Sequence, residues 1–76
     1  MAEEIDKNLL AFLEEDDFEK KYNLIIGCEK DLTDSVVESM AASLDFVIND
    51  GPLDGKITQL KSLIRTRAHF ESRRLR

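Results

Sequence analysis

Four basic side chains recur at every fourth position near the end of this sequence. They are Lys61, Arg65, His69 and Arg73, and Arg76 can extend the row. At about 100° per residue, positions four apart form one slowly drifting ridge along a helix. Such a row of cations can follow the phosphates of a nucleic acid, because guanidinium groups match phosphate oxygens and each contact releases condensed counterions. The alternative interpretation is a solvated helix face whose basic side chains pair with acidic helices of the same chain.

The net charge of −5 is distributed unevenly along the chain. Residues 1–55 carry four basic and fifteen acidic side chains, net −11, whereas residues 56–76 carry seven basic and one acidic, net +6. Such asymmetry is typical of a protein with a localised binding face.

The acidic segment contains one dense run of carboxylates, which are candidates for docking a basic protein partner. They are Glu14, Glu15, Asp16 and Asp17. Complementary potentials steer protein encounters, although most runs of this kind are only solvated surface. The same carboxylates would repel a nucleic acid and so direct it towards the basic ridge.

The sequence predicts neither a metal site nor a catalytic site. The segment 50–55 resembles a calcium loop at first sight, but EF-hand spacing places Pro52 at the third ligand position and Lys61 at the twelfth. Cys28 and His69 are accompanied by no third orienting group and no phosphate-cradling glycine loop. We therefore expect a protein that is not an enzyme and needs no cofactor, with His69 belonging to the ridge.

Length and composition indicate a single folded domain spanning residues 1–76. Charged residues make up 36% of the chain and apolar residues 42%, which is too polar for a membrane protein and too apolar for a disordered one. The longest uncharged run, 22–28, is too short to cross a membrane, and Glu3 and Glu4 stand where a signal peptide carries positive charge. A single cysteine is typical of a reducing compartment, so we expect a cytoplasmic protein.

Hydrophobic periodicity predicts four helices, at about 3–14, 17–26, 32–49 and 53–73. Asp16 and Glu19 have the spacing of a capping box for the second helix. Asp31 or Thr33 can cap the third helix, whose apolar pattern includes Val47 and Ile48 and stops at 49–52.

The fourth helix has an inner apolar face of Ile57, Leu60, Ile64 and Ala68, which leaves the basic ridge on its outer side. Leu63 and Phe70 widen that inner face on one side. The short connections favour antiparallel packing of neighbouring helices. We therefore predict an all-α fold, a small four-helix bundle, and a monomer.

Two aromatic residues, Tyr22 and Phe70, lie at the margins of the predicted apolar faces. Either ring could stack on an unpaired base if it were exposed. Because apolar mass is scarce in so short a chain, we expect both rings to be buried at the edge of the core.

The segments 13–23 and 57–76, together with the length of 76 residues, resemble the small companion proteins encoded just downstream of the UvsW recombination helicase in T-even bacteriophages. The resemblance implies a small, mobile four-helix bundle, similar to the helicase-and-RNase-D C-terminal module of RecQ-family helicases. It also implies that the protein acts together with UvsW in DNA replication, recombination and repair, in the cytoplasm of the host cell. The acidic net charge departs from the typical helicase module.

Together these observations predict a non-catalytic accessory module that contacts structured or single-stranded DNA weakly through the ridge and assists a helicase. With about four phosphate contacts, the logarithm of affinity should fall against the logarithm of salt concentration with a slope of roughly −3 to −4. The alternative is a protein-interaction module that docks a helicase or a host protein through its acidic helices and contacts no nucleic acid.

Overall fold

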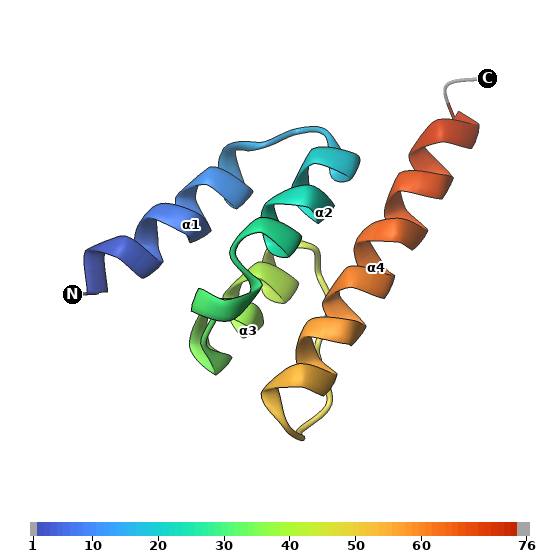
Figure 1. Cartoon of the computed structure of the whole chain (residues 1–76). Coiled ribbons are helices and arrows are strands. Elements are labelled where there is room, and N and C mark those ends of the chain that lie inside the picture. The colour runs from blue at the N-terminus through green and yellow to red at the C-terminus, as the bar shows by residue number, and fades with distance from the viewer. Residues whose placement is uncertain (1, 75–76) are drawn as a thin grey trace.

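Four α-helices follow one another along the chain: α1 (Ala2–Glu14), α2 (Phe18–Gly27), α3 (Asp34–Ser43) and α4 (Leu53–Arg74). A single turn of 3₁₀ helix, Glu29–Asp31, joins α2 to α3. The computed structural model describes residues 2–74, with side chains from residue 7 to residue 73. The predicted all-α four-helix bundle is confirmed. α2 and α3 lie between α1 and α4, and each of them packs against both (Figure 1). The consecutive helices α2 and α3 contact each other little, so the predicted antiparallel packing of neighbours does not extend to this pair.

Side-chain caps fix where α2 and α3 begin. The backbone at Asp17 is extended, and its carboxylate accepts a hydrogen bond from the Glu19 N–H at 2.9 Å. The prediction that Asp16 caps this helix is therefore wrong by one residue. At the start of α3, the Thr33 hydroxyl oxygen accepts from the Val36 N–H at 3.3 Å, which confirms one of the two predicted caps. Each cap satisfies a backbone donor that has no partner inside its helix.

The third helix, predicted over 32–49, ends at Ser43. Asp45 has a φ of 59°, in the left-handed region that terminates helices. The N–H groups of Asp45 and Phe46 both donate back to carbonyls of the last turn at 3.0 Å, in the Schellman arrangement. Asp45 thus ends the helix, a role that the sequence pattern assigned to Gly51 and Pro52.

Residues 44–52 consequently form a connection that crosses to α4, and two residues expected on a buried helix face lie in it. Val47 is 89% exposed, and Ile48 is half-buried. Both assignments to the inner face of the third helix are corrected. The Arg67 guanidinium of α4 donates to the Leu44 carbonyl at 2.6 Å, placing a cation at the negative end of the α3 dipole.

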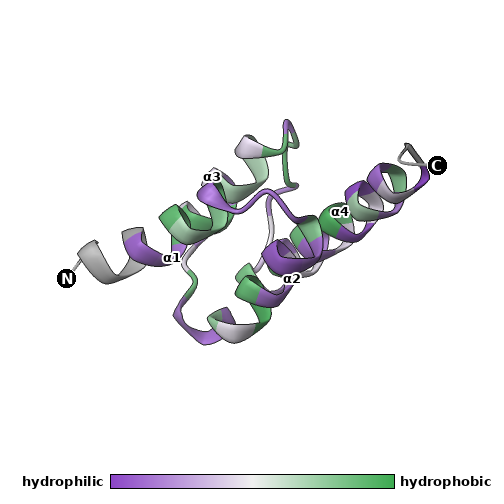
Figure 2. Cartoon of the chain, turned by 90° about the horizontal axis from the view of Figure 1, so that it is seen from above, coloured by the Kyte–Doolittle hydropathy of each residue, from purple (hydrophilic) through white to green (hydrophobic). Residues whose placement is uncertain are grey.

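The core lies where the four helices converge. Its buried residues are Phe12, Ile25, Leu32, Val36, Val37, Met40, Ala41, Leu44, Ile57, Leu60 and Ile64. The predicted inner face of α4 is confirmed for Ile57, Leu60 and Ile64, whereas Ala68 is half-buried. Figure 2 shows hydrophobic and hydrophilic residues alternating around each helix, as expected of amphipathic helices packed around one core.

The C-terminal half of α4 extends past α3 in both views (Figures 1 and 2). α4 has 22 residues and α3 has 10, so the longer helix has no α3 neighbour over its last turns. This extension carries most of the predicted ridge. Within residues 2–74, no helix is both long enough and apolar enough to span a membrane.

Candidate nucleic-acid interface

The predicted basic ridge lies on one side of α4, but its members differ in how accessible they are. Arg65, His69 and Arg73 are exposed, whereas Lys61 is half-buried. Arg76, the predicted extension, lies outside the described residues. Of the predicted set, the structure therefore brings three exposed basic side chains into one row at four-residue spacing.

Lys61 is held by an acidic side chain of the body. Its Nζ donates to both carboxylate oxygens of Glu29, at 3.2 and 3.5 Å. The two side chains are only partly exposed, so the bridge is less screened than a surface pair. At this position the structure agrees with the alternative interpretation, in which basic side chains pair with acidic ones of the same chain.

Arg65 lies over an aromatic ring of α2. Its guanidinium carbon is 5.5 Å from the centre of the Tyr22 ring, within the range of a cation–π contact. Tyr22 is half-buried, as expected. The contact holds the guanidinium over the ring, and among residues 7–73 no carboxylate forms a salt bridge with Arg65. Its donors remain available for a phosphate.

His69 and Arg73 lie on the part of α4 that extends past α3. The His69 ring makes an edge contact with Phe70, with 6.1 Å between ring centres and 65° between ring planes. Phe70 is 57% exposed, so the expectation that it is buried is wrong. The helix α3 ends at Ser43, so it does not run beside the C-terminal half of α4, where Phe70 lies (Figure 1).

Two further basic side chains of α4, Lys56 and Arg67, contact α3 and the residue that follows it. Lys56 Nζ bonds Glu38 at 3.0 Å and Asp34 at 3.1 Å. Hydrogen bonding to Glu38 first, and then to Asp34, raises the Lys56 pKa against the opposing effect of desolvation. Lys56 and Arg67 are therefore both bound by groups of the same chain. The sequence signal for the pairing of Lys56 is the acidic residue Asp34 at the start of α3, four residues before Glu38.

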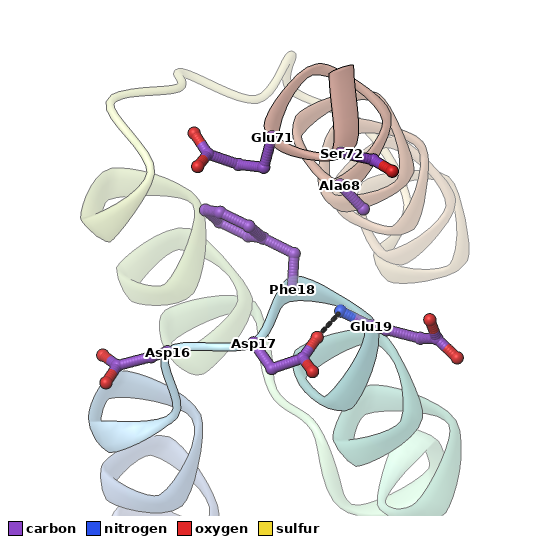
Figure 3. A pocket seen from close by; sticks show the side chains of 7 residues that line it. All are labelled: Asp16, Asp17, Phe18, Glu19, Ala68, Glu71 and Ser72. Carbon is purple, nitrogen blue, oxygen red and sulfur yellow. Dashed lines mark hydrogen bonds between the residues drawn. The ribbon is translucent and has the colours of Figure 1, made fainter. Parts of the chain in front are cut away.

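An acidic hollow of about 440 Å³ lies beside the ridge, between the start of α2 and the C-terminal half of α4. It is lined by Asp16, Asp17, Phe18, Glu19, Ala68, Glu71 and Ser72. Figure 3 shows the Phe18 ring between the two helices, with the carboxylates of Asp16 and Glu19 directed outward on either side. Carboxylates repel phosphate. A polyanion that contacts the ridge therefore approaches α4 from the side away from this hollow.

The four carboxylates predicted to bind a partner lie together at the connection between α1 and α2. Glu14 ends α1, and Asp16 is exposed. Glu15 accepts a hydrogen bond from the Asp17 N–H at 3.1 Å, while Asp17 caps α2. Glu15 and Asp17 thus stabilise the connection between α1 and α2.

Cys28 has the geometry of a structural thiol. Its Sγ donates to the Leu24 carbonyl oxygen at 2.9 Å. Burial, and then the negative charge of Asp31, raise the Cys28 pKa, which disfavours the reactive thiolate. Among the described side chains, no group of three histidine, cysteine or acidic residues is arranged to hold a metal ion.

Comparisons with protein-family models, with curated proteins and with solved structures give no significant match to this chain. The resemblance to the UvsW-associated phage proteins therefore stays a prediction.

Proposed function

We propose that this chain is a non-catalytic accessory module that contacts structured or single-stranded DNA weakly and assists a recombination helicase in the cytoplasm of a phage-infected cell. The observation that carries the proposal is the exposed row of Arg65, His69 and Arg73 on α4. Positions four apart in a helix are separated by about 6 Å along its axis. The row is thus a linear set of donors that can follow a phosphate backbone without reading bases.

The geometry lowers the expected number of phosphate contacts from four to three, because Lys61 is bound to Glu29. Three contacts correspond to a salt slope of about −2 on single strands and about −2.7 on duplex DNA. Contacts to phosphate alone give dissociation constants of about 10⁻⁴ to 10⁻⁶ M at physiological salt. Binding of this strength suits a module that a partner brings to DNA.

Charge reversal tests the proposal. Arg65→Glu and Arg73→Glu should each weaken binding to a fluorescent 20-nucleotide single strand, measured by anisotropy at 25 mM salt. Lys7→Glu is the matched control, because Lys7 is an exposed cation on α1 and the charge change is the same. The proposal fails if the wild-type chain does not bind at this salt concentration, or if Lys7→Glu weakens binding as much as Arg65→Glu.

A second candidate function is that of a protein-interaction module which docks a helicase or a host protein through its acidic helices. The hollow beside Phe18 supports it, because a partly apolar floor with a carboxylate rim complements a basic protein segment. Calorimetric titration with the helicase discriminates the two. A complex that is weakened by Asp16→Lys and unaffected by Arg65→Glu favours this second function, and the reverse pattern favours the first.

A further inference from the structure

Phe70 exposes a large apolar ring on the same helix as the exposed row of Arg65, His69 and Arg73. The side chain is 57% exposed, and it lies in the C-terminal half of α4, which extends past α3 (Figure 1). Single exposed apolar residues are common and need no ligand to explain them. The position of Phe70 beside the row is what indicates a ligand.

Two basic side chains of the row lie next to the Phe70 ring, both on the same side of it. The His69 ring meets it edge-on, with 6.1 Å between the ring centres. Arg73 follows Phe70 by three residues, and side chains three apart are neighbours on a helix surface. Around the helix axis, Phe70 lies about 100° beyond His69 and about 60° beyond Arg73. A phosphate held by either cation therefore lies beside the ring, not over it.

The surface of α4 beyond the row is uncharged over the two turns before Phe70. Leu63 and Thr66 precede Phe70 by seven and four residues, so they share its side of the helix. Both line a hollow of about 400 Å³ that has no charged residue in its lining. The other lining residues are Phe46, Thr58, Gln59 and Ser62. The acidic hollow lies beside the opposite edge of the row, towards α2. Repulsion by its carboxylates directs the rest of a bound nucleotide towards the uncharged side.

An unpaired nucleotide shows the same division, with a charged phosphate on one side and an uncharged base on the other. In a duplex the faces of the bases are covered by their neighbours, and a protein contacts only their edges in the grooves. We propose that an unpaired base stacks on Phe70 while the exposed row holds the phosphates, so that the chain binds single strands in preference to duplex. This inference rests on the proposed contact with DNA and adds which form of DNA is bound. Stacking on an aromatic ring tolerates every base, so the preference is for form and not for sequence.

The preference is diagnostic because phosphate contacts alone favour the other form. The counterion effect per contact is larger on duplex DNA than on a single strand, so a purely electrostatic row binds duplex at least as well at low salt. Anisotropy titrations at 25 mM salt compare a 20-nucleotide thymidine strand with a duplex of 20 base pairs. The wild-type chain should bind the single strand more tightly.

Variants of Phe70 test whether its ring is the cause. Phe70→Ala should weaken binding to the thymidine strand by about fivefold or more, the loss expected for one stacked base. It should leave binding to the duplex, and to a strand of abasic nucleotides, unchanged. Phe70→Tyr keeps the ring and should bind as the wild type does. Leu10→Ala is the matched control, because Leu10 is 55% exposed on α1. Circular dichroism confirms that each variant is folded.

The outcomes separate this inference from the proposed function. Tighter binding to the duplex than to the single strand overturns the stacking of a base on Phe70. So do equal effects of Phe70→Ala and Leu10→Ala, or an equal loss on thymidine and abasic strands. In each of these cases, weaker binding by Arg65→Glu still supports contact between the row and DNA. A wild-type chain that binds neither form removes both proposals.

Discussion

The bridge between Lys61 and Glu29 sets the number of cations that the ridge offers to DNA, and removing it should strengthen binding. Glu29→Gln keeps the size of the side chain and removes the charge that holds Lys61 Nζ at 3.2 Å. The lysine then becomes a fourth phosphate contact. The salt slope on single strands should steepen by about 0.7, from about −2.1 to about −2.8. If the two variants bind equally at 1 M salt, this difference in slope corresponds to a gain in affinity of about eightfold at 50 mM salt.

Anisotropy titrations of a fluorescent single strand at 25–200 mM salt measure both quantities. Glu14→Gln is the matched control for the change in charge, since Glu14 is exposed and lies on α1. Adding Lys61→Met to Glu29→Gln should return the slope to the wild-type value. If Glu29→Gln behaves like Glu14→Gln, the bridge does not withhold Lys61 from DNA. The same conclusion follows if Lys61→Met alone reduces the slope as much as Arg65→Met does. The bridge contributes at most about 1 kcal/mol to stability, so these variants should remain folded.

Three further predictions concern stability. Asp45→Gly should raise the free energy of unfolding by about 0.5–1 kcal/mol in urea titrations, because glycine adopts the φ of 59° without strain, whereas Asp45→Val should lower it by about 1–2 kcal/mol. Ile64→Ala empties a fully buried site, so the same titration should show a loss of about 2–5 kcal/mol. Hydrogen bonds to Glu38 and Asp34 raise the folded-state pKa of Lys56 above its unfolded value, so their stabilisation is complete below about pH 10.4 and is lost as pH rises further. The urea midpoint of the wild type should therefore fall more steeply between pH 10 and 12 than that of Lys56→Met.

Periodicity and capping residues were sufficient to place three of the four helices within about one residue at each end. The end of α3 was missed because Val47 and Ile48 continue the apolar pattern, while the actual stop is an aspartate in a left-handed conformation. Aspartate is tolerated there but is far less diagnostic than glycine. That single error also concealed the exposure of Phe70.

The sequence predicted which side of α4 carries the basic row, but not which residues of that row are free to bind. Helical spacing placed the ridge on the side of α4 away from Ile57, Leu60 and Ile64. Arg65, His69 and Arg73 are exposed as expected, whereas Lys61 is half-buried and bonded to Glu29. The bond from Lys61 to Glu29 joins residues 32 positions apart. Pairings of this kind depend on how α4 packs against the turn after α2, which spacing within one helix cannot reveal.

Contact between the exposed row on α4 and nucleic acid is tested most directly by an NMR titration. Adding an unlabelled 20-nucleotide single strand to ¹⁵N-labelled protein at 25 mM salt should shift amide signals most strongly at residues 65–73. Residues 16–19, which carry the carboxylate rim of the acidic hollow, should shift least. Shifts centred on residues 16–19, or none anywhere at millimolar concentrations of the strand, would contradict the account.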